Sequence, residues 1–169
     1  MKFIMTAFTN LDLALKMLAV AEDGVLTTAN IRDGEPIVWT SGKSHVVLPD
    51  RSFASNEDFV LALQNNVTIA FGAAAITLNV CREEMGYPVP EVIESPQDQV
   101  ISLVYQIRNC FAHDIAEPRW VIKRDRYKRV YDFGYKQVDL TGVHGKPFEY
   151  DDIGGLDTLA VLRHRLIGQ

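Results

Sequence analysis

The sequence predicts a mainly α-helical fold: a helical bundle with small antiparallel β-elements, formed by residues 1–169 as a single domain. Apolar residues recur every three or four positions along three stretches of the chain, which is typical of helices with one buried face. The runs typical of strands are only three to five residues long. With 47% hydrophobic and 23% charged residues among 169, the chain has a globular composition, which excludes disordered and fibrous proteins.

The N-terminal stretch is expected to form an amphipathic helix that is capped at Thr9 or Asn10, continues to about Ala21 and ends at Asp23-Gly24. It is not expected to be a secretory signal peptide, although it begins with a lysine and an apolar run. Polar residues interrupt the apolar centre that a signal peptide requires, namely Asn10, Asp12 and Lys16.

A long helix is expected from about Ser55 to Met85, because Ser55 and Asp58 have the spacing of a capping box. Residues 72–75, at its centre, are glycine and alanine, so another helix could pack closely there. The apolar stretch 67–81 is shorter than the roughly 20 residues that span a membrane. We therefore expect a buried helix rather than a transmembrane one.

The order Ser95-Pro96-Gln97-Asp98 predicts another helix start: an N-cap, a proline at the first helical position and an acid in the first turn. This helix is expected to continue to about His113. Short β-branched and aromatic runs predict a hairpin within 36–48 and a second β-element within 120–140, whose first run is Trp120–Ile122. A last helix is expected over Leu156 to Leu166.

The charge distribution points to one basic segment. The whole chain has a formal charge of −5, which argues against a generally basic nucleic-acid-binding surface. Residues 119–136, in contrast, contain seven basic residues and two acidic ones. The candidate RNA-binding residues are Arg119, Lys123, Arg124, Arg126, Lys128 and Arg129.

The same basic segment also fits a solvated β-edge that discourages aggregation, so both interpretations stay open. Four aromatic residues lie among its charges and could either stack on bases or face a core: Tyr127, Tyr131, Phe133 and Tyr135.

Several enzyme classes are excluded because their motifs are absent, including glycine-rich phosphate loops, HExxH and GxSxG. The two cysteines, Cys81 and Cys110, form no CxxC pair, so neither a disulfide framework nor a cysteine zinc site is indicated. We expect a cytoplasmic protein without a metal or another cofactor.

The segment Arg108 to His113 carries the strongest chemical signal. A guanidinium can hold phosphoryl oxygens, and an imidazole can take a proton from an attacking hydroxyl or give one to a leaving oxygen. Asn109 could orient either group. These residue types therefore suit phosphate chemistry.

Helix geometry sets a condition on this hypothesis. Five positions correspond to about 500° of rotation, so Arg108 and His113 would lie about 140° apart on a straight helix. They converge only if the helix distorts or ends near His113, or if they meet residues of a second subunit. RNA cleavage by 2′-hydroxyl attack also needs an acid and a base, and a twofold dimer would supply two histidines.

At these residues the chain resembles the HEPN superfamily, whose signature is an arginine, a polar residue, three further residues and a histidine. Members are helical bundles that often pair as metal-independent ribonucleases in toxin–antitoxin, CRISPR-associated and other defence systems. The resemblance implies that Arg108 and His113 are catalytic and that Asn109 supports them. It also implies RNA as substrate, a homodimer and an antitoxin as a further partner. The resemblance covers Arg108 to His113 tightly and Asn56 to Asp114 loosely.

One departure from the family concerns regulation. In one HEPN branch a partner nucleotidyltransferase modifies a tyrosine two positions after the motif histidine, and here that position is Ile115. We therefore expect no regulation of this kind.

A second interpretation stays open, in which the chain is a catalytically silent HEPN-like module that binds a nucleotide or a protein. Arg108 would then pair with an acid such as Asp98 or Glu117, and His113 would cap the end of its helix.

Overall fold

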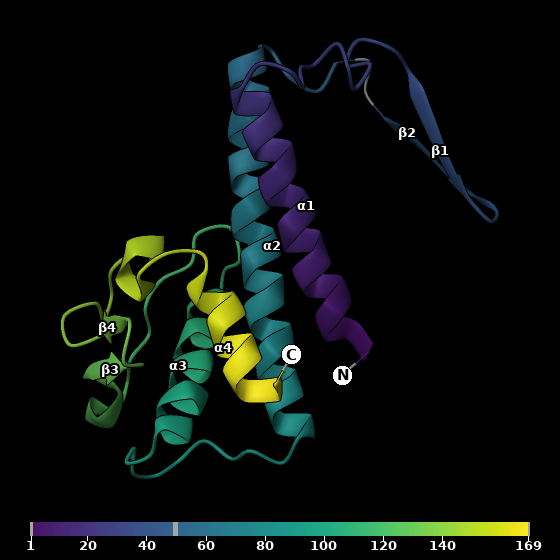
Figure 1. Ribbon diagram of the computed structural model, residues 1–169. Coiled ribbons are helices and arrows are strands. Elements are labelled where there is room, and N and C mark those ends of the chain that lie inside the picture. Colours follow the sequence, from purple (N-terminus) through teal and green to yellow (C-terminus); the bar gives the residue numbers. More distant parts are fainter. Residues whose placement is uncertain (1, 49–50, 169) are drawn as a thin grey trace. The chain divides into compact units, whose positions relative to one another are not determined.

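The computed structural model describes residues 2–48 and 51–168 (Figure 1). These residues form four α-helices: α1 (Lys2–Glu22), α2 (Asn56–Glu84), α3 (Pro96–Phe111) and α4 (Thr158–Ile167). Two antiparallel strand pairs accompany them, β1 (Ile37–Ser41) with β2 (Ser44–Leu48) and β3 (Val130–Asp132) with β4 (Gln137–Asp139). Two short 3-10 helices are η1 (Asp125–Tyr127) and η2 (Tyr150–Ile153). The predicted fold class, mainly α with small β-elements, is confirmed.

The chain divides into two compact units, Asn10–Val67 and the combination of Met1–Thr9 with Thr68–Gln169. The expectation of a single domain stays a prediction.

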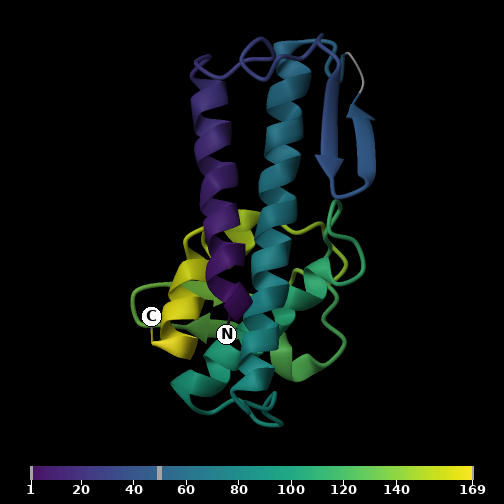
Figure 2. The ribbon, with the colours of Figure 1, turned by 90° about the vertical axis from the view of Figure 1, so that its right-hand side faces the viewer.

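In the unit Asn10–Val67, α1 and α2 pack through Ala21, Phe59 and Leu63. Figure 2 shows the β1–β2 hairpin. Its turn contains Gly42, whose φ of 59° is accessible to glycine at little cost. Trp39 pairs with Val46 across the hairpin, and every residue of β2 is exposed. The strands therefore form where the β-branched pattern predicts them. The residues of β2 do not contribute to a buried core.

The first helix begins earlier than its sequence suggests. α1 starts at Lys2, so the expected cap at Thr9 or Asn10 is wrong. Ile4, Phe8, Leu11 and Ala14 are buried and are spaced three or four positions apart. The buried stripe therefore continues through the expected cap, and helical hydrogen bonding continues with it.

The other unit contains α3, which begins as predicted. Ser95 Oγ accepts a hydrogen bond from the backbone N–H of Asp98 at 3.1 Å, and the Asp98 carboxylate accepts one from the N–H of Ser95 at 2.8 Å. The backbone N–H and hydroxyl of Ser95 lower the pKa of Asp98. This capping box satisfies donors that would otherwise lack partners at the helix start. α3 and α4 lie side by side (Figure 1).

The C-terminal end of α3 lies against α2 at Gly72. A Cβ atom on Gly72 would lie 2.5 Å from Cδ1 of Phe111 and 2.9 Å from Cγ1 of Ile115. The Phe111 ring also packs with the rings of Phe71 and Phe148, with centroids 5.6 and 5.0 Å away. The close approach expected at residues 72–75 is therefore made, and α3 is the helix that makes it.

The run Trp120–Ile122 was expected as a strand, and this expectation is wrong. It forms single backbone bonds rather than a ladder: the Trp120 N–H donates to Lys146 O at 3.0 Å, and the Gly145 N–H donates to Trp120 O at 2.9 Å. The Trp120 indole is fully buried and donates to Asp152 at 2.7 Å. Its burial accounts for the apolar pattern that resembled a strand.

Two helical stretches, Phe3–Glu22 and Asn56–Glu84, are long and apolar enough to cross a membrane. This is weak evidence, because core helices and N-terminal signal sequences meet the same criterion. In Asn56–Glu84, 44% of the apolar window is buried inside the protein.

We expect Gly72→Ala to destabilise the protein, because the new methyl group would overlap the Phe111 ring. Overpacking costs about 1–3 kcal/mol, and the gain in helix propensity returns about 1 kcal/mol. Urea unfolding followed by circular dichroism measures the difference. Gly142→Ala is the control, since no atom lies within 4 Å of the added Cβ and stability should stay unchanged. A Gly72→Ala protein as stable as the wild type would show that α2 and α3 do not approach in this way.

Candidate functional site

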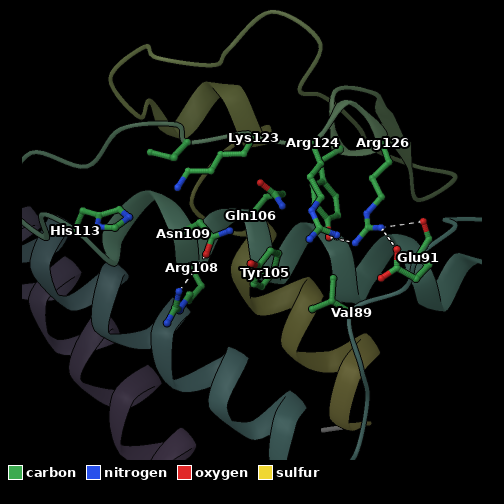
Figure 3. Close-up of a pocket in the computed structure, with 12 residues that line it drawn as sticks. Val89, Glu91, Tyr105, Gln106, Arg108, Asn109, His113, Lys123, Arg124 and Arg126 are labelled. Atoms are coloured by element: carbon green, nitrogen blue, oxygen red, sulfur yellow. Dashed lines mark hydrogen bonds and ion pairs between the residues drawn. The ribbon is translucent and has the colours of Figure 1, made fainter.

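A pocket of about 540 Å³ lies over the C-terminal half of α3 (Figure 3). The helix and the residues just after it contribute Tyr105, Gln106, Arg108, Asn109 and His113. The remaining walls come from the loop before α3 and from the chain between Val121 and Tyr127. The pocket therefore joins the Arg108–His113 segment to part of the basic segment.

Arg108 and His113 line the same pocket. α3 ends at Phe111, and its C-cap, Ala112, keeps right-handed helical dihedrals with φ −72° and ψ −24°. His113 is the first residue after this cap. The helix therefore ends near His113, which is one of the conditions that helix geometry sets.

The Arg108 side chain is oriented by its neighbour. Its Nη1 donates a hydrogen bond to Asn109 Oδ1 at 3.1 Å, as Figure 3 shows. Within the described residues no carboxylate pairs with Arg108, so it is not locked against Asp98 or Glu117. The guanidinium keeps most of its donors for a ligand.

The His113 ring is exposed and makes no hydrogen bond to a side chain or backbone group in the described parts of the chain. The turn that follows His113 is held by the side chain of Asp114. Asp114 Oδ1 accepts hydrogen bonds from the N–H groups of Ala116 and Glu117 at 2.9 and 3.0 Å. These two bonds lower the pKa of Asp114.

The chain then folds back over α3. The Arg119 N–H donates to Cys110 O at 3.2 Å, and Pro118 is buried. From there, side chains alternate between core and pocket, as in an extended chain. Trp120 and Ile122 are buried, whereas Val121 and Lys123 line the pocket.

Three of the six candidate RNA-binding residues reach the pocket: Lys123, Arg124 and Arg126. Lys123 and Arg124 are exposed and make no ion pair with a described carboxylate. Arg126 is held in place, because its Nη1 lies 2.5 Å from Glu91 Oε2 and its Nη2 donates to the Tyr127 hydroxyl at 2.9 Å. These bonds raise the pKa of Arg126.

The other three basic residues lie outside the pocket. Arg119 lines a second hollow of about 330 Å³ beside Pro118. Lys128 pairs with Asp125 at 2.7 Å, and Arg129 donates to the carbonyl of Ile93 at 3.0 Å. The sequence pattern alone did not show which of the six basic residues line the pocket.

The charge of the pocket is strongly positive. Its lining contains four cationic side chains, of Arg108, Lys123, Arg124 and Arg126, and one carboxylate, that of Glu91. Such a site in a chain of net charge −5 favours an anionic ligand.

The aromatic residues of the basic segment mostly face the core. Tyr127, Tyr131 and Phe133 are buried, and Tyr135 is exposed but does not line the pocket. The half-buried ring in the pocket is that of Tyr105, which no sequence signal marked as functional.

Sequence reasoning missed Gln106, Val89 and Glu91 as lining residues. Gln106 precedes Asn109 by three positions within α3, a spacing that places the two side chains next to each other on the helix surface. The loop residues Val89 and Glu91 carry no such signal, because their position depends on contacts between distant parts of the chain.

In the described residues, no group of three histidine, cysteine or acidic side chains could hold a metal ion. Cys81 and Cys110 are buried free thiols, and burial raises the pKa of Cys110.

No family model, curated protein or solved structure matches the chain. Membership of the HEPN superfamily therefore stays a prediction that rests on Arg108 to His113 and on the helices around this segment.

Proposed function

We propose that the protein is an endoribonuclease of the HEPN type that works as a homodimer without a metal ion. The observation that carries this proposal is the pocket that Arg108, Asn109 and His113 share with cations of the basic segment. Phosphate is the ligand that this combination suits best, and RNA is the phosphate polymer with an internal nucleophile.

Arg108 is assigned to the scissile phosphate. A planar guanidinium can hold two phosphoryl oxygens at once and stabilise the charge that grows on them during the reaction. The hydrogen bond from Arg108 to Asn109 restricts its rotation before the substrate binds. Lys123 and Arg124 are suited to the phosphates of neighbouring nucleotides.

His113 is assigned to proton transfer. The ribose 2′-oxygen attacks phosphorus, one imidazole takes the 2′-hydroxyl proton, and the bond from phosphorus to the 5′-oxygen breaks. A protonated imidazole gives its proton to that 5′-oxygen. The products are a 2′,3′-cyclic phosphate and a 5′-hydroxyl, and no water is consumed in this step.

The proposed homodimer follows from the number of proton carriers. Each protomer contributes one histidine to its pocket, whereas the reaction moves a proton at two places. A twofold axis beside the exposed His113 would bring two histidines and two arginines to one composite site.

A catalytic metal ion is not part of this proposal. The one carboxylate of the pocket, on Glu91, already pairs with Arg126, and Mg²⁺ is usually held by one or two carboxylates. The cations of the pocket would also repel a metal ion.

The cellular role follows from the same resemblance and is part of the same proposal. It is a toxin–antitoxin or defence role in the cytoplasm, in which an antitoxin protein restrains the ribonuclease.

The second candidate function is a catalytically silent HEPN-like module that binds a nucleotide or a protein. The single histidine in each pocket favours it, because a cationic pocket with one proton carrier suffices for binding.

Cleavage of RNA should continue in the presence of EDTA and should leave 2′,3′-cyclic phosphate ends. Mass spectrometry of the fragments identifies these ends, and an all-deoxy oligonucleotide of the same sequence should stay intact because it lacks the nucleophile. Complete loss of activity with EDTA, or comparable cleavage of DNA, would rule out this mechanism.

Substitution of the two assigned residues should lower turnover while the fold is kept. His113→Ala should reduce the rate about 100- to 10,000-fold, as expected for loss of a general acid or base. Arg108→Lys should also lose much of the rate, since it keeps the charge but not the planar fork. Turnover and thermal unfolding are measured on the same samples. The binding module predicts no cleavage, even by the wild type.

The proposed dimer should be visible by sedimentation velocity at micromolar concentration. Ala112→Glu adds a charge beside His113 and should weaken a twofold contact there. Ala29→Glu, at an exposed alanine of the other unit, is the matched control and should leave the dimer intact. A wild-type monomer, or a dimer that Ala112→Glu leaves unchanged, would contradict this interface.

A further inference from the structure

We propose that Gln106 reads one unpaired base of the bound RNA, with a preference for adenine. This inference rests on the proposed function, because it takes RNA as the ligand of the pocket. It adds a specificity-determining residue outside the Arg108–His113 segment.

The first observation is that the Gln106 side chain is buried and its amide has no hydrogen-bond partner among the described residues. The residue is 2% exposed, and no hydrogen bond joins its amide to another described residue. Buried polar side chains in proteins nearly always have a hydrogen-bond partner, because leaving them without one costs free energy. Neither Gln106 amide atom is among the fully buried side-chain atoms without a partner, so the amide reaches the solvent of the pocket, where a bound ligand can take the place of water.

The second observation is its place relative to the proposed phosphate site. Gln106 and Asn109 are three positions apart on α3, a spacing at which Cβ atoms lie about 5–6 Å apart. Figure 3 shows the Gln106 amide among the side chains that line the pocket, with Asn109 and Arg108 to one side and Arg124 to the other. The amide therefore lies between the cations of the pocket, where it can contact the base of a nucleotide whose phosphate they bind.

The third observation is the aromatic ring beside it. Tyr105 is half-buried in the same pocket, and its ring centroid lies 6.0 Å from that of Tyr127. The Arg126 guanidinium lies 4.9 Å from the Tyr127 centroid, which leaves Tyr105 as the ring available to a base. Stacking on one aromatic ring is a common way to hold an unpaired base.

The chemistry of the amide favours adenine. A glutamine amide offers one acceptor and two donors side by side, and it pairs in a bidentate manner with the N6 and N7 atoms of adenine. A base must be unpaired and unstacked to reach a buried amide, so the substrate is single-stranded at this position.

Fluorescence anisotropy with two 2′-O-methyl octanucleotides, of adenine and of uracil, tests the inference. The methyl group blocks 2′-oxygen attack, so binding is measured without cleavage. The wild type should bind the adenine probe at least about fivefold more tightly. Gln106→Leu and Gln106→Met should bind both probes within about twofold of each other, while Lys123 and Arg124 maintain the affinity for the uracil probe.

Gln97→Leu is the matched control, because it removes a half-buried glutamine of the same helix that does not line the pocket. It should keep the wild-type preference. A folded Gln106 variant that still prefers adenine, or a wild type that binds both probes equally, would overturn the base-reading role and leave the proposed ribonuclease intact. A wild type that binds neither probe would overturn both proposals.

Discussion

The packing of the C-terminal end of α3 against α2 is the constraint on which the rest of the site depends. Gly72 lets the Phe111 ring approach the α2 backbone so closely that a methyl group would not fit between them. Phe148 and Trp120 extend this packing, with ring centroids 5.5 Å apart. The last turn of α3 and the start of the segment that follows Pro118 thus pack against the same aromatic cluster. Both walls of the pocket depend on this packing.

The pocket concentrates positive charge in a chain that is acidic overall. Cations so close together repel one another, and the single carboxylate, Glu91, is engaged with Arg126. In contrast, Lys128 and Arg129, from the same segment, have protein partners. An uncompensated group of cations costs stability, and a polyanion would relieve that cost on binding.

Local signals predicted the start of α3 and singled out Arg108, Asn109 and His113, which line the pocket, but not Tyr105 and Gln106. The order from Ser95 to Asp98 is a self-contained capping box, so it could be interpreted without knowing the rest of the fold. Val89 and Glu91 could not be placed, because their position depends on long-range contacts such as that between Glu91 and Arg126, 35 positions apart. The start of α1 was predicted wrongly for a different reason. Asn10 is a good capping residue, but it is exposed and lies between the buried residues Phe8 and Leu11, and the burial of their stripe outweighed the local preference.

The residues at the C-terminal end of α3 influence how Arg108 and His113 are placed relative to each other, although they take no part in the proposed chemistry. On an uninterrupted helix the two side chains would diverge by about 140°, and no ligand of one pocket could contact both in the same way. The helix ends before His113, and the next turn is held by the Asp114 carboxylate, which accepts two backbone N–H groups. Pro118 also disfavours helical geometry at the residue before it. The end of the helix near His113 is therefore part of the functional signal, beside the arginine and the histidine themselves.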